Sequence, residues 1–127
     1  MPNTNIGRVQ LEIMRVLWSR GKANAREITD ALSEQRDIAH STVQTLLRQL
    51  EEKGSVGHEI QNRTFIYFPL VEEDRVTRTA TRDLIDRLFG GDAAGLVAYL
   101  LEQERIPRKE LQGLRKLIEK KTSKRGS

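Results

Sequence analysis

The chain has 127 residues, a hydrophobic fraction of 37%, a formal net charge of +4 and no cysteine, a length that suits one ordinary domain or two small ones sharing a core. No apolar run approaches the roughly 20 residues that a membrane helix needs, and the start, MPNTNIGR, lacks the basic and apolar regions of a secretory signal. The absence of cysteine excludes disulfides, thiolate metal sites and thiol catalysis, and we expect a cytoplasmic protein without membrane insertion.

Three amphipathic helices are predicted in the first 54 residues. The first, VQLEIMRVLWSR, ends at Gly21. The second, NAREITDALSEQ, begins with Asn24 as its cap, and Glu27 reaches back in a capping box. The third, STVQTLLRQLEEK, repeats its apolar side chains at intervals of three and four residues and ends at Gly54. The apolar stripe of each helix therefore faces a common core.

The hydrophobic period changes from 3.6 to 2 after Gly54. VGHEI and TFIYFPL have the alternation and the β-branched and aromatic residues of strands, and QNR between them makes a short turn in which Asn62 suits a positive φ. Three helices followed by a hairpin describe a winged helix-turn-helix over residues 1–71.

The rest of the chain is predicted to be helical again. The segments are EEDRVTRTATRDLIDRLF, AAGLVAYLL and PRKELQGLRKLIEKK, and the middle one carries no charge and must be covered on nearly every side. We expect residues 72–121 to form a three-helix dimerisation domain that a second copy covers, and residues 122–127 to be a disordered tail. The fold class is mainly α with a small β-hairpin. The expected dimer contacts are Leu84, Leu88, Val97, Leu101, Leu114 and Ile118.

The polar face of the third helix suits the DNA major groove. Side chains that donate and accept hydrogen bonds, together with methyl groups, can read base edges there. Glutamine suits adenine, arginine suits guanine or a phosphate, and threonine methyls suit thymine. At the hairpin tip, Arg63 would meet phosphates or the minor groove of double-stranded DNA. A solvated helix face and a solvated turn arginine are the alternatives. The candidate residues on this helix are Ser41, Thr42, Gln44, Thr45, Arg48 and Gln49.

An enzyme is not predicted, and neither is a cofactor or a metal. His40 and His58 lie on different elements and in no metal-ligand or nucleophile-base spacing, so each is interpreted as a surface or strand residue. The alternative function is a winged-helix protein-interaction module. It stays open because residues 1–71 hold nine Lys/Arg against eight Asp/Glu, which is little bulk charge for DNA. The polar third helix, without exposed aromatics, counts against it.

Three segments together resemble a known family. They are EIMRVLW followed by Gly21, STVQTLLRQLEEKG, and RTFIYFPLV, which matches the family's wing strand with its arginine, tyrosine and proline. In order and spacing they resemble the penicillinase-repressor family, the BlaI/MecI type with its copper-responsive CopY branch, over residues 7 to about 121.

This resemblance implies a dimeric winged-helix repressor that binds a palindromic operator of a resistance or stress operon. The C-terminal helices would form the dimer interface. Thr42, Gln44 and Thr45 would face bases, with Ser41 and Arg63 nearer the DNA backbone.

The chain departs from the family pattern at the third helix. The family's arginine matches position 49, where this chain has Gln49, and Arg48 lies one residue earlier, about 100° around the helix. The family's small hydroxyl cap matches Ala39. We therefore expect the helix to begin at Ser41, with Gln44 completing a capping box.

The resemblance also implies how repression could be relieved. In the penicillinase branch, a membrane metalloprotease receptor that senses β-lactam leads to cleavage of an Asn-Phe bond in the dimerisation domain. The matching pair here is Tyr99 and Leu100. The copper branch requires C-terminal cysteine pairs, so copper sensing by that route is excluded.

Overall fold

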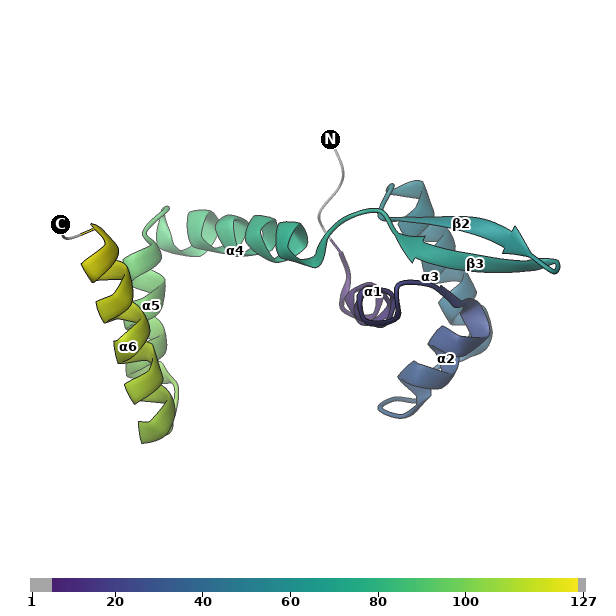
Figure 1. Cartoon of the computed structure of the whole chain (residues 1–127). Helices are drawn as coiled ribbons and strands as arrows, with labels where there is room; N and C mark the ends of the chain where they lie inside the picture. The colour runs from purple at the N-terminus through teal and green to yellow at the C-terminus, as the bar shows by residue number, and fades with distance from the viewer. Residues whose placement is uncertain (1–5, 126–127) are drawn as a thin grey trace. The chain divides into compact units, whose positions relative to one another are not determined.

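The computed structural model describes residues 6–125, which contain six helices and three strands (Figure 1). The chain divides into two compact units, residues 1–83 and residues 84–127. The division falls inside helix α4 (Glu73–Phe89), whereas the sequence predicted a boundary after residue 71. Each unit is described by itself below.

Three helices build the core of the first unit: α1 (Arg8–Arg20), α2 (Ala25–Ser33) and α3 (His40–Glu52). Each places its apolar stripe inward, as the 3.6-residue period predicts. The Trp18 ring packs at the edge of this core, and its Nε1 donates to the Val71 carbonyl oxygen at 2.8 Å, which fixes the chain just after the sheet. The fully buried side chains are Ile13, Met14, Leu17, Ile28, Val43, Leu47, Leu50 and Val56.

Helix α2 begins as predicted. The Asn24 side chain accepts a hydrogen bond from the Glu27 amide at 2.8 Å, and the Glu27 carboxylate accepts one from the Asn24 amide at 2.9 Å. This reciprocal capping box satisfies two amides that the helix itself cannot pair.

The predicted start of α3 is wrong. The helix begins at His40, one residue before the expected Ser41, with Ala39 in the cap conformation and no side-chain cap. No capping box with Gln44 forms, because Ser41 already lies in the first turn. The first residue of α3 instead makes a tertiary contact: His40 Nδ1 lies 3.1 Å from Thr29 Oγ1 on α2.

The sheet has a third strand that the sequence analysis did not predict. Strand order is β1-β3-β2, with β1 (Ala23–Asn24) and β2 (Val56–Gln61) on either side of β3 (Thr64–Pro69), all antiparallel. At two residues β1 is too short to show a period. The hairpin between β2 and β3 is the wing. Its turn is the pair Asn62 and Arg63, both with positive φ, the geometry that matches the twist of a two-residue hairpin.

Gly54 allows the chain to leave α3 and enter β2. The Ser55 amide bonds the Leu50 carbonyl, and the Gly54 amide bonds the Glu51 carbonyl. This pair of hydrogen bonds requires a left-handed backbone at Gly54, whose φ is +81°.

The second unit holds the end of α4, α5 (Ala93–Gln103) and α6 (Arg108–Arg125), and α5 and α6 run antiparallel in Figure 1. Helix α6 extends to Arg125, into the segment 122–127 for which the sequence predicts a disordered tail, and residues 126–127 lie outside the described part. No helix among the described residues is long and apolar enough to cross a membrane.

Candidate nucleic-acid interface

The predicted polar face of α3 is exposed in the structure. Thr45 Oγ1 donates to the Ser41 carbonyl oxygen at 3.1 Å within the helix. Its hydroxyl proton is therefore used locally and its methyl group is left for contact with a partner. The exposed residues of this face are Ser41, Thr42, Gln44, Thr45, Arg48 and Gln49.

Arg48 and Gln49 lie in different environments. Gln49 Oε1 accepts a hydrogen bond from Gln10 Nε2 of α1 at 3.0 Å, and Gln10 Oε1 accepts from Lys53 Nζ at 3.1 Å. Arg48 instead borders the space between α3 and the wing. One step of about 100° around the helix separates a side chain bonded to α1 from one directed towards the wing.

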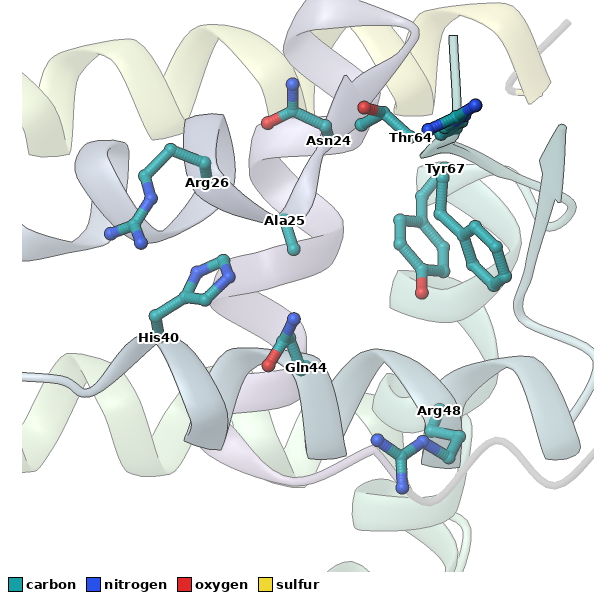
Figure 2. A pocket seen from close by; sticks show the side chains of 10 residues that line it. Asn24, Ala25, Arg26, His40, Gln44, Arg48, Thr64 and Tyr67 are labelled. Carbon is teal, nitrogen blue, oxygen red and sulfur yellow. The ribbon is translucent and has the colours of Figure 1, made fainter. Parts of the chain in front are cut away.

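A groove of about 600 Å³ lies between α3, the start of α2 and strand β3 (Figure 2). Three of the predicted DNA-binding residues line it, and they are Gln44, Arg48 and Arg63. Three guanidinium groups and no carboxylate line it, so the groove suits an anion. The complete lining is Asn24, Ala25, Arg26, His40, Gln44, Arg48, Arg63, Thr64, Phe65 and Tyr67.

Two lining residues, Arg26 and His40, were not among the predicted DNA contacts. Arg26 is the second residue of α2, after the cap Asn24. A usable signal was present in the sequence, because the first helix of a helix-turn-helix crosses the DNA backbone. His40 was interpreted as a surface residue, whereas in Figure 2 its ring rises from the groove side of α3.

The inner face of the wing packs against the end of α3. His58 Nδ1 on β2 donates to the Glu51 carboxylate of α3 at 2.7 Å. The His58 ring stacks on Phe65 with centroids 4.1 Å apart. Burial and then the Glu51 charge raise the pKa of Tyr67, while Arg48 opposes the rise. These contacts fix the spacing between α3 and the wing.

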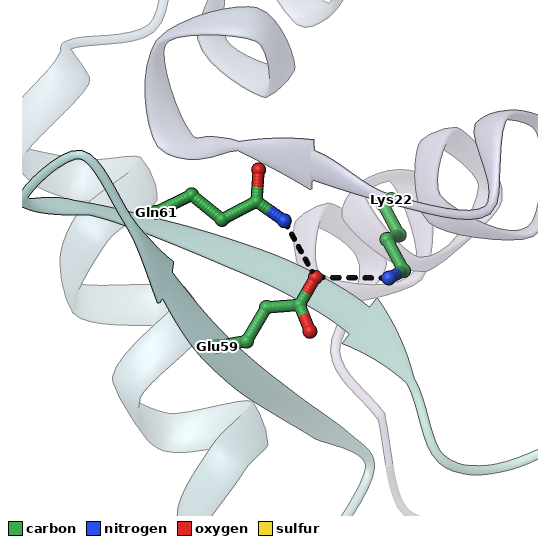
Figure 3. A network of polar contacts seen from close by, with 3 residues as sticks. All are labelled: Lys22, Glu59 and Gln61. Carbon is green, nitrogen blue, oxygen red and sulfur yellow. Dashed lines mark hydrogen bonds and ion pairs between the residues drawn. The ribbon is translucent and has the colours of Figure 1, made fainter.

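The outer face of the wing is attached to the loop after α1. The Glu59 carboxylate accepts from Lys22 Nζ at 2.8 Å and from Gln61 Nε2 at 2.9 Å (Figure 3). The hydrogen bond and charge of Lys22 lower the pKa of Glu59. Both partners are well exposed, so this ion pair adds little stability. Its effect is to neutralise a carboxylate on the wing.

The described residues, 6–125, contain no group of three or more His, Cys, Asp or Glu side chains that could hold a metal ion. The chemistry that the site offers is hydrogen bonding and positive charge.

Comparison with known proteins identifies relatives over most of the chain. A family model described as penicillinase repressor matches residues 6–120. The chain is 29% identical over 116 residues to the methicillin resistance regulatory protein MecI of Mammaliicoccus sciuri, across 91% of this chain and 94% of that protein. It is 27% identical over 114 residues to the penicillinase repressor of Bacillus licheniformis, across 90% of this chain and 89% of that protein.

A solved structure resembles the first unit. The solution structure of the DNA-binding domain of the repressor BlaI superposes with a TM-score of 0.52 at 32% identity. The match covers 57% of this chain and 90% of that domain.

Proposed function

The chain belongs to the penicillinase repressor family and is a DNA-binding transcriptional repressor, not an enzyme, and from this premise we propose that it binds a palindromic operator as a homodimer. The observation that carries the proposal is the exposed polar face of α3 beside a groove lined by three arginines and no carboxylate.

Helix α3 enters the major groove in this proposal. Gln44 and the methyl groups of Thr42 and Thr45 face base edges. The sugar-phosphate strand that borders the major groove then lies in the groove between α3 and the wing, where Arg26 and Arg48 meet phosphates. Arg63 at the wing tip reaches the adjacent phosphates or minor groove.

The second unit supports the dimer. Among the described residues 84–125, Ile85 is the one buried apolar side chain, and large apolar side chains on all three helices are exposed. Many exposed large apolar side chains on one small unit are typical of an interaction site. A second copy of these helices would cover it and would give a two-fold complex, with half-sites about 10 to 10.5 base pairs apart or a multiple of that.

Specific binding is the first test. We expect the purified chain to bind its own upstream DNA at least about a thousandfold more tightly than random DNA at physiological salt, because base contacts add to phosphate contacts. Fluorescence anisotropy titration at low and physiological salt measures this. Equal binding to both DNAs, or no binding to either, would contradict the proposal if no other site in the genome is bound specifically. That result would favour a protein-interaction module.

Release from DNA by proteolysis is the second part of the proposal. The bond between Tyr99 and Leu100 lies inside α5, where the Leu100 carbonyl accepts from the Glu104 amide at 3.0 Å. A helical bond is a poor protease substrate, so we propose that α5 opens locally before a membrane metalloprotease sensor, or a protease that it activates, cuts there. Mass spectrometry of the repressor from induced cells should detect fragments ending at Tyr99, and intact repressor during induction would contradict this.

A further inference from the structure

The buried hydroxyl of Thr29 determines which nitrogen of His40 carries hydrogen. Thr29 is 4% exposed, and its Oγ1 donates to the Ala25 carbonyl oxygen at 2.7 Å. A hydroxyl has one proton, and that proton lies within α2 because two oxygens at this distance would otherwise repel each other. The Thr29 oxygen must therefore accept from His40 Nδ1, 3.1 Å away.

This bond fixes the chemistry of the second ring nitrogen. In a neutral imidazole one nitrogen donates and the other accepts, so a hydrogen on Nδ1 makes Nε2 of His40 an acceptor. A phosphate oxygen is also an acceptor, so it forms no hydrogen bond with the neutral Nε2. After the ring takes up a second proton, Nε2 donates and the ring is cationic, which is the state that binds phosphate.

The groove around His40 lacks any anion of its own. The ring contacts Thr29 on α2. The same groove is lined by Arg26 on α2, by Gln44 and Arg48 on α3, and by Arg63, Thr64 and Tyr67 on the wing. No carboxylate lines the groove, so nothing within it neutralises an imidazolium until a polyanion enters. Figure 2 shows the ring at the end of the groove near Arg26.

Resting on the proposed function, we propose that His40 contacts a DNA backbone phosphate through Nε2 and takes up a proton as DNA binds. The first residue of α3 thereby contacts a phosphate, and this contact forms only when the His40 ring is protonated on both nitrogens. DNA affinity is linked to pH, and this contact is to phosphate, so it carries no sequence information.

The test is the pH dependence of DNA binding by the full chain, measured by anisotropy from pH 5.5 to 8.0 at constant ionic strength. We expect affinity to rise as pH falls, by at most about tenfold per pH unit for each protomer. His40→Gln should abolish this slope. His58→Gln removes the other of the two histidines in the sequence. It should lower affinity at every pH by loosening the wing, and leave the pH slope unchanged.

Two further readouts separate a phosphate contact from a structural role. Random DNA should show the same pH slope as the operator. The slope of log affinity against log salt should steepen by about 0.9 per protomer between pH 8.0 and pH 5.5, as one more phosphate is neutralised, and His40→Gln should remove that change.

The wild-type chain alone provides a measurement that does not depend on a variant folding. Long-range ¹H–¹⁵N spectra of the free protein at high pH should show His40 as the Nδ1–H tautomer. A neutral Nε2–H tautomer would overturn the proposal, and so would an unchanged pH slope in His40→Gln or a wild-type affinity independent of pH. Absence of DNA binding at every pH would instead overturn the proposed function on which this inference rests.

Discussion

At the scale of single residues, the contrast between Arg48 and Gln49 shows how position on a helix determines what a side chain reaches. Both are exposed polar residues of α3, yet Gln49 bonds Gln10 of α1 while Arg48 lines the groove beside the wing. We expect Arg48 to provide the positive charge that the family places at position 49, but towards a different part of the DNA.

We expect Gln44 to contribute to sequence-specific DNA binding and Arg63 to contribute to sequence-independent DNA binding. Gln44→Ala should cost about 1 to 3 kcal/mol at particular operator base pairs, because an amide that reads a base edge is lost. Arg63→Ala should weaken binding to all sequences alike and reduce the salt slope, because a phosphate contact is lost. Anisotropy with operator and random DNA distinguishes the two changes. Equal losses on both DNAs for Gln44→Ala would contradict the base-reading role.

At the scale of secondary-structure elements, the spacing between α3 and the wing is set by side chains on the inner face of the sheet. His58 and Glu51 join β2 to α3 on the inner face. The exposed ion pair of Lys22 and Glu59 on the outer face joins the loop after α1 to β2 and adds little to this spacing. A repressor that places α3 in one DNA groove and the wing in the next needs this spacing before it meets DNA, since ordering the wing on binding would lower its affinity.

Glu51 and the adjacent Glu52 offer a matched test of that spacing. Glu51→Ala removes the carboxylate that His58 contacts, whereas Glu52→Ala removes the same charge from an exposed position. We expect Glu51→Ala to destabilise the wing by about 0.5 to 1.5 kcal/mol, the range for one hydrogen bond, and Glu52→Ala to have little effect. Hydrogen exchange of the β2 and β3 amides measures the difference. Equal protection in both variants would show that the contact between His58 and Glu51 does not stabilise the wing.

At the scale of the whole molecule, the two units differ in how they are stabilised. Residues 1–83 have a buried core supplied by three helices and the sheet. Residues 84–125 have exposed leucines instead, with Leu88 73% exposed. Three short helices cannot bury all of their apolar surface among themselves, and this supports a dimer as the state in which the second unit is stable.

Substitutions at Ile118 and Leu70, two equally exposed apolar side chains, test the dimer. The two side chains are 56% and 57% exposed, one in the second unit and one in the first. Ile118→Glu should produce monomers at micromolar concentration, because a charge would be buried in the interface. Leu70→Glu should leave the dimer intact. Sedimentation velocity measures both, and a wild-type chain that is itself monomeric at this concentration would refute the dimer.

The sequence by itself determined which segments form the helices and the two hairpin strands, where α2 and the hairpin turn begin, and which family the chain resembles. These features depend on neighbouring residues: apolar periodicity, a capping Asn24 with Glu27 three positions later, and Asn62 in a tight turn. Local signals of this kind lie within a few residues of the structure that they specify.

Only the tertiary structure decided where α3 begins, that β1 exists, and which polar residues share one groove. His40, the first residue of α3, has its ring bonded to Thr29, eleven residues earlier. Gln49 is bonded to Gln10, 39 positions away, although its own helix pattern places it on the polar face. Such contacts join residues distant in the chain, and no periodicity within either segment records them, because the free energy that selects them arises only when the elements pack.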